Sequence, residues 1–174
     1  MANFTSVPSI GQLRNNSCWA ACLAWFLRAN AGTGRPTWTQ KDVLKTYWNS
    51  VDADGGLPGD YVVNLWRDDT RLRMQSCVFP TPDATLSSLP LGRAPVCIAF
   101  KHITGFSHMN VIWRIDDDTV MCMEPFWPLP GVDGKRTGRI VRRDIDYFNH
   151  GDNVVLAWAK PFSGRATSTP DDFD

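Results

Sequence analysis

The sequence predicts an α+β fold, in which helices come first and an antiparallel sheet follows. Helical patterns run as far as Trp66, and short strand-like segments begin after Arg71. The chain has no repeated βαβ alternation, no internal repeat and no GxGxxG or P-loop motif. These observations favour one α+β domain over a parallel, nucleotide-binding architecture.

The first predicted helix lies in the segment 16–30, which is rich in Ala, Leu, Trp and Phe. The polar residues Asn15, Asn16 and Ser17 precede it as a capping region, so we expect a buried helix to begin at about Ser17. Glycines and a proline in the segment 31–36 end that helix.

Two shorter helices are expected next. Thr39 and Asp42 have the spacing of a capping box, which predicts a helix through about Trp48. The glycine-rich segment 52–59 then reads as a loop, and residues 60–66 as a third helix.

Strand composition recurs six times after Arg71. The predicted strands span residues 72–79, 96–100, 109–115, 119–123, 139–145 and 154–159. Three aspartates at 116–118 indicate a tight hairpin turn between the third and fourth strands, because Asp tolerates the backbone angles of such turns. Residues 163–174 are polar and end in acidic residues, so we expect a flexible tail after a single domain over residues 1–162.

Charge and composition argue against several partner classes. Eighteen Lys and Arg balance eighteen Asp and Glu, so nothing favours nucleic acid or an anionic membrane as a partner. The longest apolar runs, 19–27 and 95–100, fall short of the ~20 residues that span a bilayer. The first residues lack a signal-peptide pattern, and we therefore expect any export to use another route.

The five cysteines point to a free thiol. Their number is odd and no CxxC pair occurs, which argues against a disulfide framework or a zinc ribbon. Four of them lie in apolar segments, where we expect small buried side chains; they are Cys22, Cys77, Cys97 and Cys122. Near Asp52 and Asp60 the spacing lacks the glutamate of a calcium loop, so no metal is expected.

Cys18 differs from the other cysteines because it stands in the first turn of the predicted buried helix. A helix N-terminus stabilises an anion and so favours a nucleophilic thiolate. Gln12, six residues upstream, can loop back over the helix start and donate, with the Cys18 N–H, to a tetrahedral oxyanion.

The histidine that could serve Cys18 as a base is His108. It begins an apolar strand, whereas His102 and His150 lie beside loop residues, where we expect them to face water. If the hairpin pairs around its aspartate turn, Glu124 lies at the same end as His108 and can accept from its imidazole.

Gln12-x5-Cys18-Trp19, the His108 strand and a polar residue sixteen positions after the histidine together resemble the papain-like cysteine peptidases. The short chain is most similar to the compact bacterial branch, which includes double-glycine leader peptidases and effector proteases. The resemblance implies an N-terminal catalytic Cys helix packed on a C-terminal antiparallel sheet. It also implies catalytic roles for Cys18, His108 and Gln12. Glu124 occupies the position of the orienting Asn or Asp, and its extra methylene alters the reach to the imidazole.

The activity that this resemblance implies is cleavage of protein substrates without a cofactor, at small-residue or double-glycine sites as in the compact branch. It further implies a bacterial effector or toxin, delivered by a signal-peptide-independent route to a target-cell cytoplasm, with an immunity or inhibitor protein that covers the active site. Thiolate chemistry equally serves glutamine deamidation, transglutamination or cell-wall amide hydrolysis, and an inactive binding domain is a further alternative. Trp127 either shields the histidine, as in papain-like enzymes, or anchors a loop.

Overall fold

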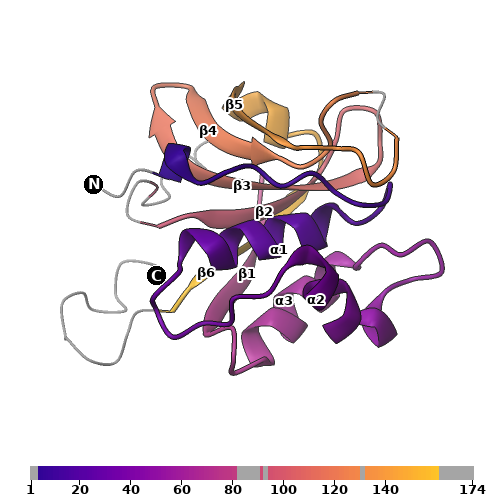
Figure 1. Cartoon of the computed structure of the whole chain (residues 1–174). Helices are drawn as coiled ribbons and strands as arrows, with labels where there is room; N and C mark the ends of the chain where they lie inside the picture. The colour runs from indigo at the N-terminus through magenta and orange to yellow at the C-terminus, as the bar shows by residue number, and fades with distance from the viewer. Residues whose placement is uncertain (1–3, 82–90, 92–93, 130–131, 161–174) are drawn as a thin grey trace.

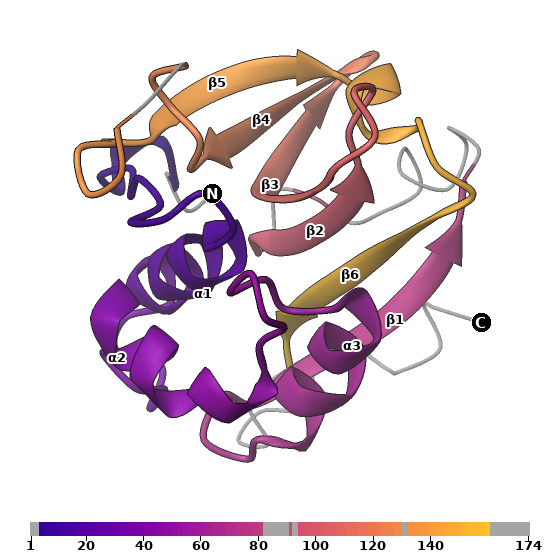
Figure 2. The same ribbon diagram turned by 90° about the vertical axis from the view of Figure 1, so that its right-hand side faces the viewer.

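The computed structural model describes residues 4–81, 91, 94–129 and 132–160. Three α-helices lie on one side of a six-stranded antiparallel sheet (Figures 1 and 2). The helices are α1 (Cys18–Ala29), α2 (Gln40–Thr46) and α3 (Gly59–Asp68). Short 3-10 turns span Phe4–Ser6, Trp48–Ser50 and Ile145–Phe148. The α+β prediction is confirmed.

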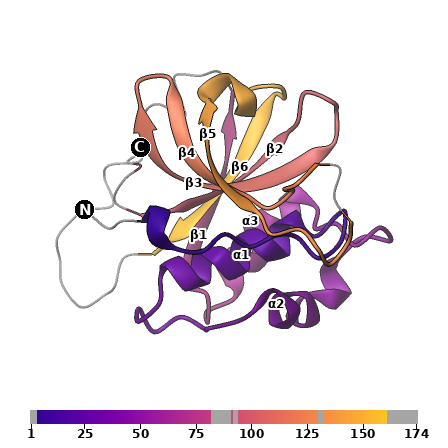
Figure 3. The same ribbon diagram turned by 45° about the horizontal axis from the view of Figure 1, so that its top comes forward.

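The sheet is strongly twisted (Figure 3). Its strands are β1 (Met74–Pro80), β2 (Val96–Lys101), β3 (Ser107–Asp116), β4 (Thr119–Glu124), β5 (Arg139–Asp144) and β6 (Asn153–Ala159). They lie in the order β1-β6-β2-β3-β4-β5, and every neighbouring pair is antiparallel. All six predicted strands are present, with ends that differ from the predicted ones by at most two residues.

The helices also match their predicted positions, with corrections at the ends. The second helix ends at Thr46, and Trp48 begins a separate 3-10 turn. The third runs to Asp68 rather than Trp66. None of the helices within the described ranges is long and apolar enough to cross a membrane. The predicted tail, 163–174, lies outside the described residues, so the boundary at residue 162 stays a prediction.

A hydrophobic core lies on each face of the sheet. Helix α1 is apolar all round, and nine of its residues are buried against the first face, where Trp25 stacks on Trp113 with ring centroids 5.1 Å apart. The second face holds a separate cluster that includes Ile98, Ile112 and Phe148. Helix α1 is therefore fixed on the sheet along its whole length.

The predicted capping box at the start of α2 is present. The Thr39 N–H donates to the Asp42 carboxylate at 2.9 Å, and the Asp42 N–H donates to the Thr39 hydroxyl at 3.3 Å. The two bonds satisfy amides that a helix start otherwise leaves unpaired.

Two glycines allow the segment before α1 to cross the segment before β5 at close range. A Cβ on Gly11 would lie 1.9 Å from the carbonyl oxygen of Arg136, and one on Gly138 would lie 2.6 Å from that of Ile10. Gly138 also has a φ of +66°, which other residues rarely adopt. Only hydrogen at these two Cα atoms permits the crossing.

We expect Gly11→Ala to lower the free energy of unfolding by about 1–3 kcal/mol or more, because the added methyl overlaps a backbone oxygen that cannot move alone. Gly59→Ala is the matched control: its Cβ would meet Val155 at an ordinary 3.5 Å, at the first position of a helix. Urea unfolding followed by circular dichroism measures both. Equal stability of the two variants would contradict the packing argument.

Candidate active site

Cys18 is the first residue of α1, as the sequence indicated, but the helix is not capped as predicted. The Ser17 hydroxyl donates to the Arg14 carbonyl at 3.0 Å and accepts from the Arg14 N–H at 2.9 Å, so it makes no capping bond to α1. The first turn carries no acidic residue. The positive end of α1 is thus left to act on the Cys18 thiol and on any anion beside it.

His108 and Glu124 form a buried pair at one end of the β3–β4 hairpin. Nε2 of the imidazole lies 2.7 Å from Oε1 of the carboxylate, and the two residues are only 5% and 2% exposed. The Cys18 side chain lies near the imidazole in the same cleft and helps to raise the pKa of His108. Because Nε2 is held by Glu124, Nδ1 is the ring nitrogen that remains for the thiol. The structure therefore brings Cys18, His108 and Glu124 together.

A β-bulge puts the carboxylate on the correct face of the sheet. The pairing of β3 with β4 shifts by one residue between Ile112 and Arg114. If the register next to the turn continued along the whole hairpin, Glu124 would lie opposite Val111. Beyond the bulge it lies opposite Asn110 instead.

This shift decides whether the pair can form. Side chains two residues apart on a strand share a face, so His108 and Asn110 point the same way and Glu124 joins them. A register that differs by one residue would turn Glu124 to the opposite face from His108. The hairpin predicted from sequence placed both residues at the correct end, but without the bulge they would not meet.

The Glu124 carboxylate is held by several further groups. Its Oε1 also accepts from the Phe126 N–H at 2.9 Å, while Oε2 lies 3.5 Å from Arg143 and 3.4 Å from the Tyr147 hydroxyl. Burial alone would raise the pKa of Glu124. The hydrogen bond and charge of His108, together with the bonds from Phe126 and Asn110, outweigh burial and hold that pKa below its ordinary value.

His108 shifts in the complementary direction. Burial lowers its pKa, but hydrogen bonds and charge from Cys18 and Glu124 more than compensate and raise it above the ordinary value of 6.5. Both shifts favour a charged imidazolium beside a charged carboxylate. The site is thus suited to hold a proton on the imidazole.

Three phenylalanine rings surround the imidazole, and none of them was predicted from the sequence to belong to the site. The ring centroids of Phe100, Phe106 and Phe126 lie 5.7, 5.8 and 6.2 Å from that of His108. These rings limit the access of water to the charged pair. Phe100 and Phe126 stand near the ends of predicted strands, and that was the only sequence signal for them.

Of the two roles left open for Trp127, the structure favours the loop anchor. Its carbonyl accepts from the N–H groups of Thr137 and Gly138, and the Arg139 guanidinium lies 4.8 Å from its ring centroid. Its neighbour Phe126 is one of the three rings that contact His108.

Gln12 is buried in the loop that leads into α1. Its Nε2 donates to the Arg14 carbonyl at 2.8 Å and to the Asn15 carbonyl at 2.5 Å, and its own N–H donates to Pro125 at 2.9 Å. Both amide hydrogens are therefore engaged with the backbone, and Gln12 braces this loop. Donation by Gln12 to a substrate oxyanion stays a prediction.

A cleft of about 720 Å³ gives access to the pair. Cys18 and His108 lie in its wall, with Asn15 and Asn16 on one side and the loop around Gly56 on another. Cys18 is partly exposed. The thiol can thus meet an extended chain that enters from solvent.

Cys22, Cys97 and Cys122 are buried and His150 is exposed, as predicted, whereas Cys77 is only half-buried and His102 is half-buried against Phe106 and Tyr147 rather than facing water. Burial raises the pKa of Cys22, Cys97 and Cys122, and raises that of the half-buried Cys77 to about 11. His102 stacks on a ring at the cleft rim, and His150 is exposed. In the described part of the chain, no cluster of His, Cys, Asp or Glu suits a metal ion.

Comparison with known proteins supports the fold. Neither a family model nor a curated protein matches the sequence. Among solved structures, the peptidase domain of Streptococcus ComA, a bifunctional ABC transporter involved in a quorum sensing pathway, matches with a TM-score of 0.59 and 13% identity. The match covers 88% of this chain and 99% of that domain. The chain has the fold of a papain-like peptidase domain.

Two further matches have lower scores. The Pseudomonas avirulence protein AvrPphB gives a TM-score of 0.42 at 8% identity, covering 90% of this chain and 98% of that one. Ly7917 gives 0.43 at 14% identity, covering 91% and 58%. At these scores neither match adds to the fold assignment, which depends on the match to the ComA domain.

The buried pair predicts a window of pH in which it stabilises the fold. The raised pKa of His108 gives stability that is full below its unfolded value of 6.5 and is lost as pH rises through the folded pKa. The lowered pKa of Glu124 gives stability that is full above 4.5 and is lost as pH falls through the folded pKa. We therefore expect Glu124→Gln to destabilise most between pH 4.5 and 6.5.

Urea unfolding of wild type and Glu124→Gln at about pH 3, 5.5 and 9 tests this window. Asp118→Asn, which removes an exposed carboxylate at the hairpin turn, is the control and should show no such maximum. A stability difference that is the same at all three pH values would mean that the pair is not ionised in the folded protein.

Proposed function

We propose that this chain is a cysteine peptidase in which Cys18, His108 and Glu124 act together. The single observation that supports this most strongly is the Cys18 thiol at the start of α1, in an open cleft beside the buried His108–Glu124 pair. A nucleophile, a base and a group that orients the base are the parts that acyl transfer requires.

The first step transfers the thiol proton to Nδ1 of His108. The sulfur then attacks the carbonyl carbon of a peptide bond, and the carbonyl oxygen becomes an oxyanion. Glu124 accepts the N–H of Nε2, which keeps Nδ1 directed at the thiol and stabilises the imidazolium. The uncapped start of α1 supplies the Cys18 N–H to the oxyanion.

The second half of the reaction restores the enzyme. His108 gives its proton to the leaving amine as the C–N bond breaks, and an acyl group remains on the sulfur. His108 then takes a proton from water, which attacks the thioester and releases the acid. Gln12 can add a second oxyanion donor if its amide turns away from the carbonyls of Arg14 and Asn15.

The sequence resemblance extends the proposal to a bacterial effector or toxin that cuts proteins inside a target cell, at small-residue or double-glycine sites. An immunity or inhibitor protein that covers the open cleft would then protect the producer. Expression of wild type and Cys18→Ala in candidate target cells tests the setting, because toxicity should need the thiol. Equal growth in both cultures would speak against a toxin.

We expect Cys18→Ala to abolish proteolysis, with a loss of about a thousandfold or more, because the nucleophile is removed. Enrichment of new protein N-termini after incubation with a cell lysate measures the activity. Cys22→Ala is the matched control, one helical turn away. The Cys22 thiol is buried and bonded to the Met109 carbonyl, so this variant should lose stability but keep its proteolytic activity.

The same experiment separates the alternatives. New N-termini that appear with wild type and not with Cys18→Ala support peptidase chemistry. A small mass gain on intact proteins, without fragments, would indicate deamidation instead. If wild type and Cys18→Ala give the same N-termini and the same protein masses, the inactive binding domain is the alternative that remains.

Asn110 should tune the site without being essential. It is fully buried, lies opposite Glu124 and helps to lower the pKa of that carboxyl group, so it helps to keep the carboxylate charged. We expect Asn110→Ala to slow turnover about two- to tenfold, the effect of one lost hydrogen bond, and to move the acid limb of the pH–rate profile to higher pH. An unchanged pH profile would reduce Asn110 to a packing residue.

A further inference from the structure

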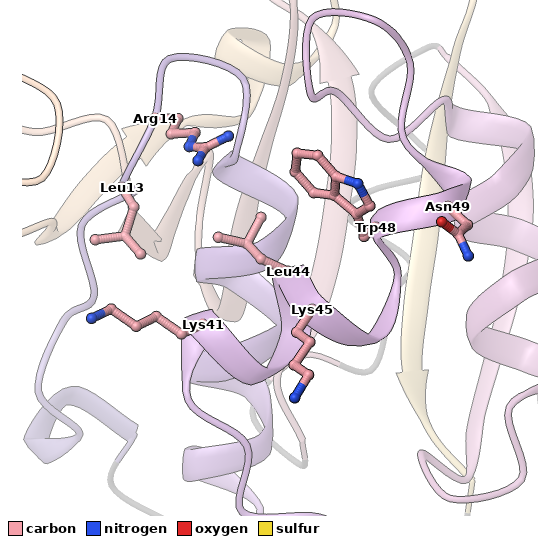
Figure 4. A pocket seen from close by; sticks show the side chains of 7 residues that line it. All are labelled: Leu13, Arg14, Lys41, Leu44, Lys45, Trp48 and Asn49. Atoms are coloured by element: carbon pink, nitrogen blue, oxygen red, sulfur yellow. The ribbon is translucent and has the colours of Figure 1, made fainter.

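A second hollow, of about 560 Å³, lies outside the cleft and belongs to no step of the proposed reaction. It is bounded by the loop that leads into α1 and by the outer face of α2. Its main lining residues are Leu13, Arg14, Lys41, Leu44, Lys45 and Trp48. The leucines and the indole form an apolar floor, with Arg14 on one side and the two lysines on the other (Figure 4).

Helix α2 presents this surface by its periodicity. Gln40, Val43 and Tyr47 form its buried face. Lys41, Leu44 and Lys45 follow the i, i+3, i+4 pattern of an adjacent, outward face of α2, and Trp48 extends it from the 3-10 turn that follows the helix. Trp48 is 56% exposed there, whereas the tryptophans of α1 and α3 are buried. An exposed indole at the centre of a hollow is a common anchor for a partner side chain.

The charges of this surface are of one sign. Three of its lining residues are cations and none is acidic, although the chain as a whole has no net charge. The Arg14 guanidinium lies 5.9 Å from the Trp48 ring centroid, so cation and indole are presented together. The complementary ligand is an apolar side chain flanked by carboxylates. A peptide with an apolar residue between aspartates or glutamates has that chemistry.

The hollow and the cleft are separated only by a short piece of chain. Leu13 and Arg14 line the hollow, and Asn15, Asn16 and Cys18 line the cleft. Consecutive Cα atoms are 3.8 Å apart, so the Cα atoms of Arg14 and Cys18 are at most about 15 Å apart. An extended peptide covers that distance in about five residues.

We propose that this hollow is an exosite that binds an acidic and apolar segment of the protein substrate, about five residues from the scissile bond. The substrate role rests on the proposed peptidase function, but the binding itself does not. Capture at the exosite would align the substrate chain across Asn15 and Asn16 toward Cys18. It would give selectivity that the open cleft does not supply by itself.

Fluorescence anisotropy with a labelled peptide tests the binding. The probe has a tryptophan between two pairs of aspartates, and the protein is Cys18→Ala, so that nothing is cleaved. Saturable binding should weaken about tenfold in Lys41→Glu/Lys45→Glu, where attraction becomes repulsion, and in Trp48→Ala. Arg114→Glu/Arg142→Glu is the control with the same change in net charge, at exposed residues near the distant hairpin turn.

Two control ligands narrow the interpretation. A probe with lysines in place of the aspartates should not bind, and adenosine monophosphate should not displace the acidic probe. Equal affinity of the probe for the control and the Lys41→Glu/Lys45→Glu proteins would overturn the exosite. Displacement by the nucleotide would overturn the peptide as its ligand.

The substrates themselves separate this proposal from the proposed function. Proteins that wild type cleaves and Lys41→Glu/Lys45→Glu spares should carry an acidic and apolar segment about five residues from the new N-terminus. Cleavage of the same set by both would overturn the exosite and leave the peptidase intact. Probe binding without any cleavage by wild type would overturn the peptidase and leave a peptide-binding surface.

Discussion

The structure of the site depends on one constraint, the burial of a carboxylate and an imidazole side by side. Glu124 and His108 are almost inaccessible to water. A charge in such a place is costly unless it is paired and hydrogen-bonded. The imidazole and the carboxylate pair with each other at 2.7 Å. The Phe126 N–H also donates to the carboxylate, and the Cys18 thiol favours the charged imidazole. The same contacts favour a protonated imidazole and leave Nδ1 for the Cys18 thiol.

Satisfying the pair requires segments that are far apart in the sequence. The bulge in β3 turns Glu124 to the face that His108 occupies. Helix α1, packed on the opposite face of the sheet, carries Cys18 at its first residue. The close crossing at Gly11 ties the loop before α1 to the segment before β5. The three side chains of the proposed triad meet only when the sheet and α1 are both in place, so the proposed site forms with the complete fold.

How much of this was predictable depends on how local each feature is. Cys18 was found because a helix start is visible in sequence, and Glu124 because two strands around a tight turn have matching ends. The bulge has no such mark: it falls in an apolar run around Trp113 without a glycine. The Ser17 and Gln12 side chains were expected to cap and to donate to an oxyanion, but each bonds the neighbouring backbone. Rotamers of this kind are set by three-dimensional packing, which composition and spacing do not encode.

At position 124 this chain has a glutamate where the peptidases that it resembles have Asn or Asp, and the glutamate fits this hairpin for a geometric reason. Its carboxylate takes the imidazole N–H and the Phe126 N–H on one oxygen, while the other oxygen faces Arg143 and Tyr147. An amide at this position would present an NH₂ group to one of these donors and would lose the negative charge that raises the pKa of His108. The glutamate carboxylate therefore contacts the imidazole on one side and the Arg143 guanidinium and Tyr147 hydroxyl on the other. Tyr147 packs against the second hydrophobic core, and these hydrogen-bond partners explain how a charged residue can remain in a place that water scarcely reaches.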